Sequence, residues 1–240
     1  MEININCDLG EKSKFHSTEN DPDLLNIVNS ANIACGYHAG DEGTMNKVID
    51  ISKRNGVSIG AHPSFNDPDN FGRKRMKLND REIRKLIIDQ YEILQRIAFQ
   101  HNENVTHIKP HGALNNMACE DMIYLVPTGS KMEVAAKKLN MKIACEIFAD
   151  RNYEDDGNLV SRSKSYALIT DPKEAKSHVL KMVTNQALNC HSGKQIPCKI
   201  DSVCIHGDNL SSLATAKSIK ENLIANELIL KPLNKMKKFS

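Results

Sequence analysis

The chain has 240 residues, of which 40% are hydrophobic and 26% are charged, and its formal net charge is +2. This balance provides no electrostatic basis for binding nucleic acid or an anionic membrane, and no segment is long and apolar enough to span a bilayer. We expect a single domain covering residues 1–240, because α/β barrels of this length commonly form one domain.

The expected compartment follows from the amino terminus and the cysteines. The chain enters a predicted strand directly, without the pattern of a signal peptide. Its seven cysteines include no Cys-x-x-Cys pair, and four of them fall inside predicted strands. We therefore expect a reduced, cytoplasmic protein without a disulfide framework.

Seven strands are predicted along the chain. Six of them alternate apolar and polar residues with the period of two that is typical of strands, and one is a short apolar run. In chain order they cover residues 3–8, 32–38, 57–62, 105–111, 123–127, 143–150 and 202–208.

Helical patterns separate most of these strands. They cover residues 23–30 and 44–55, then a long segment after the capping box that starts at Asn79, a segment that starts at Asp171-Pro172, and residues 211–226. Alternating strands and helices predict parallel strands joined by right-handed crossovers. Between residues 112 and 123 there is too little chain for a full crossover, so this helix should be shortened or missing. The lysine-rich ending at 231–238 is expected to be a solvated tail.

The polar faces of the strands indicate the architecture. Parallel strands are usually apolar on both faces, because helices cover both sides of the sheet. A polar second face is explained if the sheet closes on itself and its interior is a reaction chamber. We therefore predict an α/β fold, a (β/α) barrel of about seven parallel strands.

The ends of these strands carry the candidate catalytic residues, because active sites of α/β barrels lie at the carboxyl ends of their strands. A single histidine on a strand is more often a core residue, but four of the nine histidines end separate strands near glycine. The remaining histidines at 16, 101, 178 and 191 are expected at the surface, and His107 is equally consistent with structure or function. The predicted catalytic set is Asp8, His38, His62, Lys109, His111, Asp150 and His206.

Clustered aspartate and histidine fit two kinds of chemistry, proton exchange near neutral pH and the binding of a divalent metal that activates water. Whether a metal binds is left open; its candidate ligands are Asp8, His38, His62 and His111. Lys109 and Arg151 could hold an anionic substrate, and Arg73 is either a further anion clamp or a solvated loop residue. Asp208 precedes a predicted helix start, where a phosphate could bind.

No nucleotide-binding motif is present in the sequence. The run from Gly10 to Ser13 resembles a phosphate-binding loop, but it lacks the earlier glycine, and Glu11 separates the glycine from Lys12.

Several sequence blocks together resemble the LamB/YcsF family, whose members are the A subunits of 5-oxoprolinase. The blocks are DLGE at 8–11, SANIACGYHAGD at 30–41, GAHPSF at 60–65, NFGR at 70–73, KPHGAL at 109–114, EIFADR at 146–151 and HGD at 206–208. They occur in family order from residue 1 to about residue 228. The chain departs from the family pattern by its short segment after Gly112, by Asn115 in place of a usual tyrosine, and by Asn152 in place of a frequent glycine.

The resemblance implies a seven-stranded barrel of the type found in glycoside hydrolases and polysaccharide deacetylases. It also implies ATP-dependent opening of the lactam of 5-oxo-L-proline (pyroglutamate) to L-glutamate, with ATP as co-substrate and with 5-oxoprolinase subunits B and C as partners. Within the matching blocks, Glu11 and Asp41 join Arg73, Arg151 and Asp208 as residues expected to bind substrate or phosphate. Two alternatives stay open: a metal-dependent hydrolase or deacetylase acting on a carbohydrate or amide, and a non-catalytic binding subunit.

Overall fold

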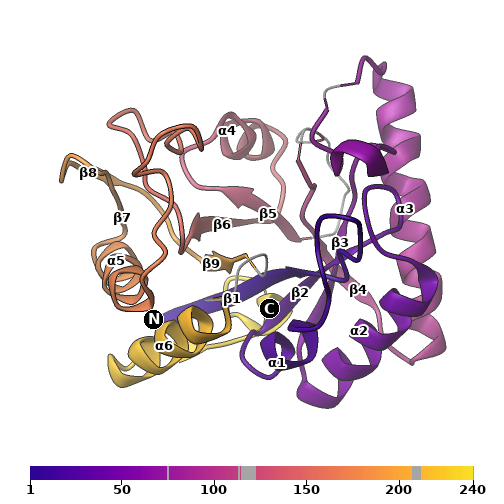
Figure 1. Ribbon diagram of the computed structural model, residues 1–240, viewed down its shortest axis with the longest axis horizontal. Coiled ribbons are helices and arrows are strands. Elements are labelled where there is room, and N and C mark those ends of the chain that lie inside the picture. Colours follow the sequence, from indigo (N-terminus) through magenta and orange to yellow (C-terminus); the bar gives the residue numbers. More distant parts are fainter. Residues whose placement is uncertain (75, 113, 115–122, 207–211, 240) are drawn as a thin grey trace.

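Seven parallel strands form a closed barrel in the computed structural model, which describes residues 1–74, 76–112, 114, 123–206 and 212–239 (Figure 1). Each strand pairs with the next along the chain, and β9 pairs with β1 to close the barrel. The predicted fold class is therefore confirmed. The barrel strands are β1 (Glu2–Leu9), β2 (Ser30–Ala34), β3 (Ser58–His62), β4 (Val105–Ile108), β5 (Ile123–Pro127), β6 (Ile143–Phe148) and β9 (Ser202–Ile205).

Helices surround the strands, as Figure 1 shows, and consecutive helices contact one another around much of the barrel. They are α1 (Asp21–Leu25), α2 (Glu42–Asn55), α3 (Asp80–Gln100), α4 (Lys131–Lys138), α5 (Pro172–Asn185) and α6 (Ser212–Ala225). A two-stranded antiparallel hairpin, β7 (Ala187–Asn189) and β8 (Gln195–Pro197), follows α5. No helix within these described residues is long and apolar enough to cross a membrane.

The helix predictions differ from the structure at two places, and a third prediction is not tested. The helix predicted at 23–30 is α1, which starts at Asp21 and ends at Leu25, because Ser30 already begins β2. Helix α4 was not predicted, although Ser130 caps it by accepting a hydrogen bond from the Glu133 amide. The shortened crossover falls mostly on residues 113 and 115–122, which lie outside the described residues.

The alternation along β1 assigns its residues to two environments. Ile3, Ile5 and Cys7 are buried in the main hydrophobic core. Asn4 and Asn6 alternate with them, and both are fully buried in a polar network inside the barrel. The lumen is therefore a hydrogen-bonded interior, as the sequence pattern predicted.

Amides and hydroxyls from neighbouring strands fill the lower lumen. The Asn32 side-chain amide donates to Asn6 Oδ1 at 2.7 Å and to Asp8 Oδ1 at 2.8 Å. The Asn6 amide donates to Ser202 Oγ at 2.9 Å, and His107 Nε2 lies 3.0 Å from Asn32 Oδ1. These contacts connect β1, β2, β4 and β9. They therefore fix the position, along the barrel axis, of the functional side chains nearer the carboxyl ends of the strands.

The carboxyl-terminal segment closes the opposite end of the barrel. Strand β10 (Ile229–Leu230) pairs with the start of β1, and the 3₁₀ helix η2 (Leu233–Lys235) contacts β4. Leu233 and Met236 are buried against Ile123, Leu125 and Ala144. The lysine-rich ending is therefore packed instead of forming the expected solvated tail, because its apolar side chains cover this end of the barrel.

Gly60 in β3 leaves room for the imidazole of His107. A Cβ atom at Gly60 would lie 2.1 Å from His107 Nε2, and both residues are paired across β3 and β4. We expect Gly60→Ala to lower the free energy of unfolding by about 1–3 kcal/mol through overpacking. Urea denaturation checks this value. The loss should shrink in a His107→Ala background, and an equal loss in both backgrounds would contradict the explanation.

Candidate functional site

A cavity of about 290 Å³ opens at the carboxyl ends of the barrel strands, the location that the sequence predicted for the active site. Strands and the loops that follow them supply its walls, so residues far apart in the sequence meet there. Seven of the predicted site residues line this cavity: Asp8, Glu11, His62, Arg73, Lys109, His111 and His206.

Lys109 is the buried cation of the site. Its Nζ lies 2.9 Å from Asp8 Oδ1, 3.4 Å from Glu146 Oε2 and 3.0 Å from Cys204 Sγ. The side chains of Lys109 and Glu146 are 7% and 1% exposed, so these contacts replace the water that the charges would otherwise need. Because protein groups already bind this ammonium, its charge serves mainly to neutralise the carboxylates of the site and not to bind substrate.

The two carboxyl groups beside Lys109 differ in acidity. Burial acts to raise the pKa of Asp8, but the charge of Lys109 opposes it most strongly, and that pKa lies well below its usual range. Burial raises the pKa of Glu146, although Lys109 opposes this shift. Asp8 is therefore the carboxylate that carries the charge, and Glu146 is the group that more readily holds a proton.

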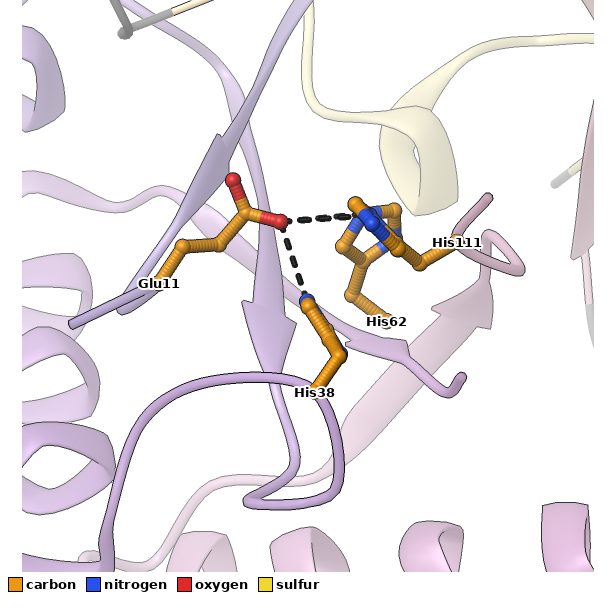
Figure 2. A group of neighbouring side chains, drawn as sticks. All are labelled: Glu11, His38, His62 and His111. Carbon is orange, nitrogen blue, oxygen red and sulfur yellow. Dashed lines mark hydrogen bonds and ion pairs between the residues drawn. The ribbon is translucent and has the colours of Figure 1, made fainter. Parts of the chain in front are cut away.

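Glu11 and three histidines form a second group, which Figure 2 shows converging on one carboxylate oxygen. Glu11 Oε1 lies 3.0 Å from His38 Nε2, 3.2 Å from His111 Nδ1 and 3.6 Å from His62 Nε2. Burial opposes ionisation of Glu11, but its close contacts with the imidazoles of His111 and His38 lower its pKa well below its usual range. This group is called the Glu11–histidine cluster below.

Asp150 and His206 form a hydrogen-bonded pair, of which His206 lines the cavity. His206 Nδ1 lies 2.9 Å from both oxygens of the Asp150 carboxylate, and the imidazole stacks on Phe148 with ring centroids 5.5 Å apart. Burial alone would lower the pKa of His206, but the charge of Asp150 raises it. A carboxylate that orients one ring nitrogen leaves the other for proton exchange with a substrate.

Two of the residues expected to bind substrate or phosphate have other settings. Asp41 caps α2 by accepting hydrogen bonds from the Thr44 amide and hydroxyl, and it does not line the cavity. Arg151 is buried, where it donates to the carbonyl oxygen of Val160 at 2.7 Å. Asp208 lies outside the described residues. Sequence proximity to a strand end does not distinguish a capping residue from a binding residue.

Other cavity residues were not assigned to the site from the sequence. Glu146 belongs to the polar face of its strand, so its alternation was a usable signal. His16 was expected at the surface, but it lines the cavity and stacks on Phe71 with ring centroids 4.4 Å apart. Arg162 comes from the loop before α5, where no strand pattern indicates a direction.

His107 and His178 are buried away from the cavity. The structure assigns His107 a packing role, because it is fully buried in the amide network and does not line the cavity. Burial lowers the pKa of His107 to about 3, and the charge of Lys109 adds to this shift. His178 was expected at the surface, but it is only 8% exposed, and burial lowers its pKa to about 4.

The sequence model of the LamB/YcsF family matches residues 3–125 and 120–238. This chain belongs to the LamB/YcsF family. Among curated relatives, the 5-oxoprolinase A subunit of Rhodopseudomonas palustris (strain ATCC BAA-98 / CGA009) is 39% identical over 250 residues, covering 97% of this chain and 98% of the relative. The protein of the same name from Campylobacter jejuni subsp. doylei is 41% identical over 240 residues, covering 93% and 94%.

Solved structures place this LamB/YcsF protein in the same fold as two kinds of protein. The lactam utilization protein from Thermus thermophilus superposes with a TM-score of 0.88 at 29% identity, covering 97% of this chain and 100% of that protein. The peptidoglycan N-acetylglucosamine deacetylase Bc1960 has a TM-score of 0.50 at 16% identity, covering 100% and 89%. The second similarity concerns the fold alone.

Acid should destabilise the LamB/YcsF protein through its buried neutral histidines. The folded-state pKa of His107 is about 3, below the usual 6.5, so the unfolded chain binds more protons between these values. The stability that this imidazole contributes is present above pH 6.5 and is lost as the pH falls toward 3. We expect His107→Gln to reduce the slope of unfolding free energy against pH by about 1.4 kcal/mol per pH unit within this window.

Urea denaturation at a series of pH values measures that slope. The absolute stability of the variant does not enter the comparison, because only the pH dependence reports the proton. An unchanged slope in His107→Gln would show that this imidazole does not titrate on unfolding.

Proposed function

We propose that this chain is the A subunit of an ATP-dependent 5-oxoprolinase, which opens the lactam of 5-oxo-L-proline to L-glutamate with hydrolysis of ATP. The observation that carries the proposal is His206, which Asp150 orients and which lines one cavity with Lys109 and Asp8. The near full-length similarity to proteins named as the A subunit of 5-oxoprolinase supports the choice of substrate.

The cavity suits a small, anionic lactam. Its volume of about 290 Å³ is at the small end of ligand-binding pockets. Arg73 and Arg162 line it and supply guanidinium groups that can bind the substrate carboxylate. Lys109, in contrast, is already paired with Asp8, so we assign it to holding the charge balance of the site.

Ring opening requires a leaving group and proton transfers. An amide carbon is a poor electrophile, so phosphorylation of the lactam oxygen by ATP would create a leaving group before water attacks. His206, oriented by Asp150, would take the proton of that water. Protonation of the ring nitrogen as its bond to carbon breaks yields the free amine and leaves the former lactam carbon as an acyl phosphate. A second water then attacks this acyl phosphate, so that inorganic phosphate leaves and the side-chain carboxylate of glutamate remains.

Subunits B and C are the proposed partners. The sequence carries no recognised nucleotide motif, so we expect turnover with ATP to depend on the complex. We place the complex in the cytoplasm, in keeping with the reduced cysteines expected from the sequence.

A reconstituted complex of this chain with 5-oxoprolinase subunits B and C tests the proposal. With ATP and 5-oxoproline, it should release glutamate and ADP. His206→Gln should lower kcat by about 10²- to 10⁴-fold, because it removes the proton acceptor. His191→Gln is the matched control, since His191 is an exposed residue that stacks on Tyr166 outside the cavity.

Two outcomes would contradict the proposal. Failure of the wild-type complex to form glutamate would exclude the reaction. Equal rates for His206→Gln and His191→Gln would exclude His206 as the proton acceptor and so remove the observation on which the proposal rests. The second candidate, a hydrolase independent of ATP, is favoured by the Glu11–histidine cluster, and hydrolysis by the isolated chain with a divalent metal would establish it.

A further inference from the structure

The Glu11–histidine cluster gathers four donor atoms at one point inside the barrel mouth (Figure 2). One ligand atom from each of Glu11, His38, His62 and His111 can be chosen so that all four lie within 4.8 Å of one another. The three histidines are buried, and they follow or end three consecutive strands, β2, β3 and β4. Four donor atoms this close together need a proton or a cation between them.

Two backbone carbonyls fix the protonation of two of the rings. His62 Nδ1 lies 2.5 Å from the carbonyl oxygen of Lys109, and His111 Nε2 lies 2.9 Å from the carbonyl oxygen of Phe71. A carbonyl oxygen only accepts, so each ring carries its N–H hydrogen on that side. The opposite nitrogens, His62 Nε2 and His111 Nδ1, then present lone pairs to each other at 2.9 Å.

Facing lone pairs require an electron-pair acceptor between them. Glu11 Oε1, another lone-pair donor, lies 3.2 Å from His111 Nδ1 and 3.6 Å from His62 Nε2. One shared proton binds two of these three atoms at most, whereas a metal ion binds all of them. Metal-binding histidines typically donate their second ring N–H to a carbonyl or carboxylate, which is the arrangement of both rings here.

The spacing of the donor atoms fits a small ion. Bonds of about 2.0–2.2 Å in a tetrahedral site place ligand atoms about 3.4 Å apart. The measured separations around Glu11 Oε1 are 3.0, 3.2 and 3.6 Å. Three imidazoles and one carboxylate suit zinc and neighbouring first-row metals better than magnesium or calcium, which prefer oxygen ligands.

We propose that Glu11, His38, His62 and His111 form a binding site for one divalent first-row transition metal ion. Glu11 replaces Asp8 in the ligand set that was expected from the sequence. His38 completes the set through Nε2, because this nitrogen lies 3.0 Å from Glu11 Oε1. Its Nδ1 is buried and has no hydrogen-bond partner among the described residues. Because Glu11, His62 and His111 also line the cavity, a bound ion would supply Lewis acidity to the proposed reaction site.

The neighbouring group of Asp8, Cys204 and His206 does not carry the same inference. Lys109 Nζ lies 2.9 Å from Asp8 Oδ1 and 3.0 Å from Cys204 Sγ, so an ammonium already supplies the positive charge there. His206 Nδ1 is paired with Asp150. The two groups therefore divide the cavity into a side neutralised by lysine and a side suited to a metal.

Titration of the chelator-treated full chain with Co²⁺, followed by its visible absorption, tests the site without substrate or partners. We expect one equivalent of Co²⁺ to bind, with the visible absorption spectrum of Co²⁺ in a four-coordinate site. His62→Ala and Glu11→Gln should each weaken binding at least about tenfold, because loss of a supporting residue alone typically costs 10- to 100-fold. Glu11→Gln retains the size of the side chain and serves if His62→Ala does not fold, as judged by circular dichroism.

His191→Ala is the control, since Cys190 and His191 are a rival pair of donor residues and both lie outside the cavity. Its binding should match that of the wild type. No stoichiometric binding by the wild-type chain would overturn the proposal, as would binding that is lost in His191→Ala but retained in Glu11→Gln. Metal binding is measured here without turnover, so its failure and failure of the proposed reaction are separate results.

Discussion

The constraint on which the rest of the site depends is the burial of the Lys109 ammonium inside the barrel. A buried charge is tolerated only if neighbouring groups replace its hydration. Asp8 from β1, Glu146 from β6 and Cys204 from β9 supply those groups, so one side chain that follows β4 is held by three strands. The carboxylates and the thiol around Lys109 thus meet the need of one buried cation for partners.

The same residue connects the two halves of the cavity. The side chain of Lys109 is bound by Asp8, while its backbone carbonyl oxygen orients His62. A displacement of Lys109 would therefore disturb both the carboxylate side and the Glu11–histidine cluster. Beneath them, the amide network of Asn6 and Asn32 sets the height of Asp8, and Gly60 leaves the space for His107. The contacts that stabilise the barrel interior therefore also position the functional side chains.

The sequence predicted the fold because alternate side chains of a strand point to opposite faces, so the period-two pattern of apolar and polar residues reflects the strand geometry directly. Alternation in β1 identified the lumen residues, and the capping box at Asn79 located the start of α3. Most strand-end residues met as expected, since parallel strands of a barrel end on one rim. What periodicity could not predict was the setting of a loop residue, as Asp41 and His16 demonstrate.

The proposed metal ligand set illustrates the same limit. Asp8 and Glu11 are separated by only two residues, and both were candidates for the site. Strand periodicity favoured Asp8 as a ligand, because it lies on the polar face of β1, whereas Glu11 follows the strand end. The choice between them depends on Lys109, which pairs with Asp8 and lies 101 residues later in the chain. No local pattern contains that information.

A double-mutant cycle between Lys109 and Asp8 tests the central constraint most directly. Urea denaturation would compare the wild type, Lys109→Met, Asp8→Asn and the double variant. We predict that Lys109→Met alone lowers the free energy of unfolding by about 3–5 kcal/mol, because it leaves buried carboxylates without their cation. The double variant should recover part of this loss. Strictly additive effects of the two substitutions would contradict the account, since they would show that the ammonium and the carboxylate do not depend on each other.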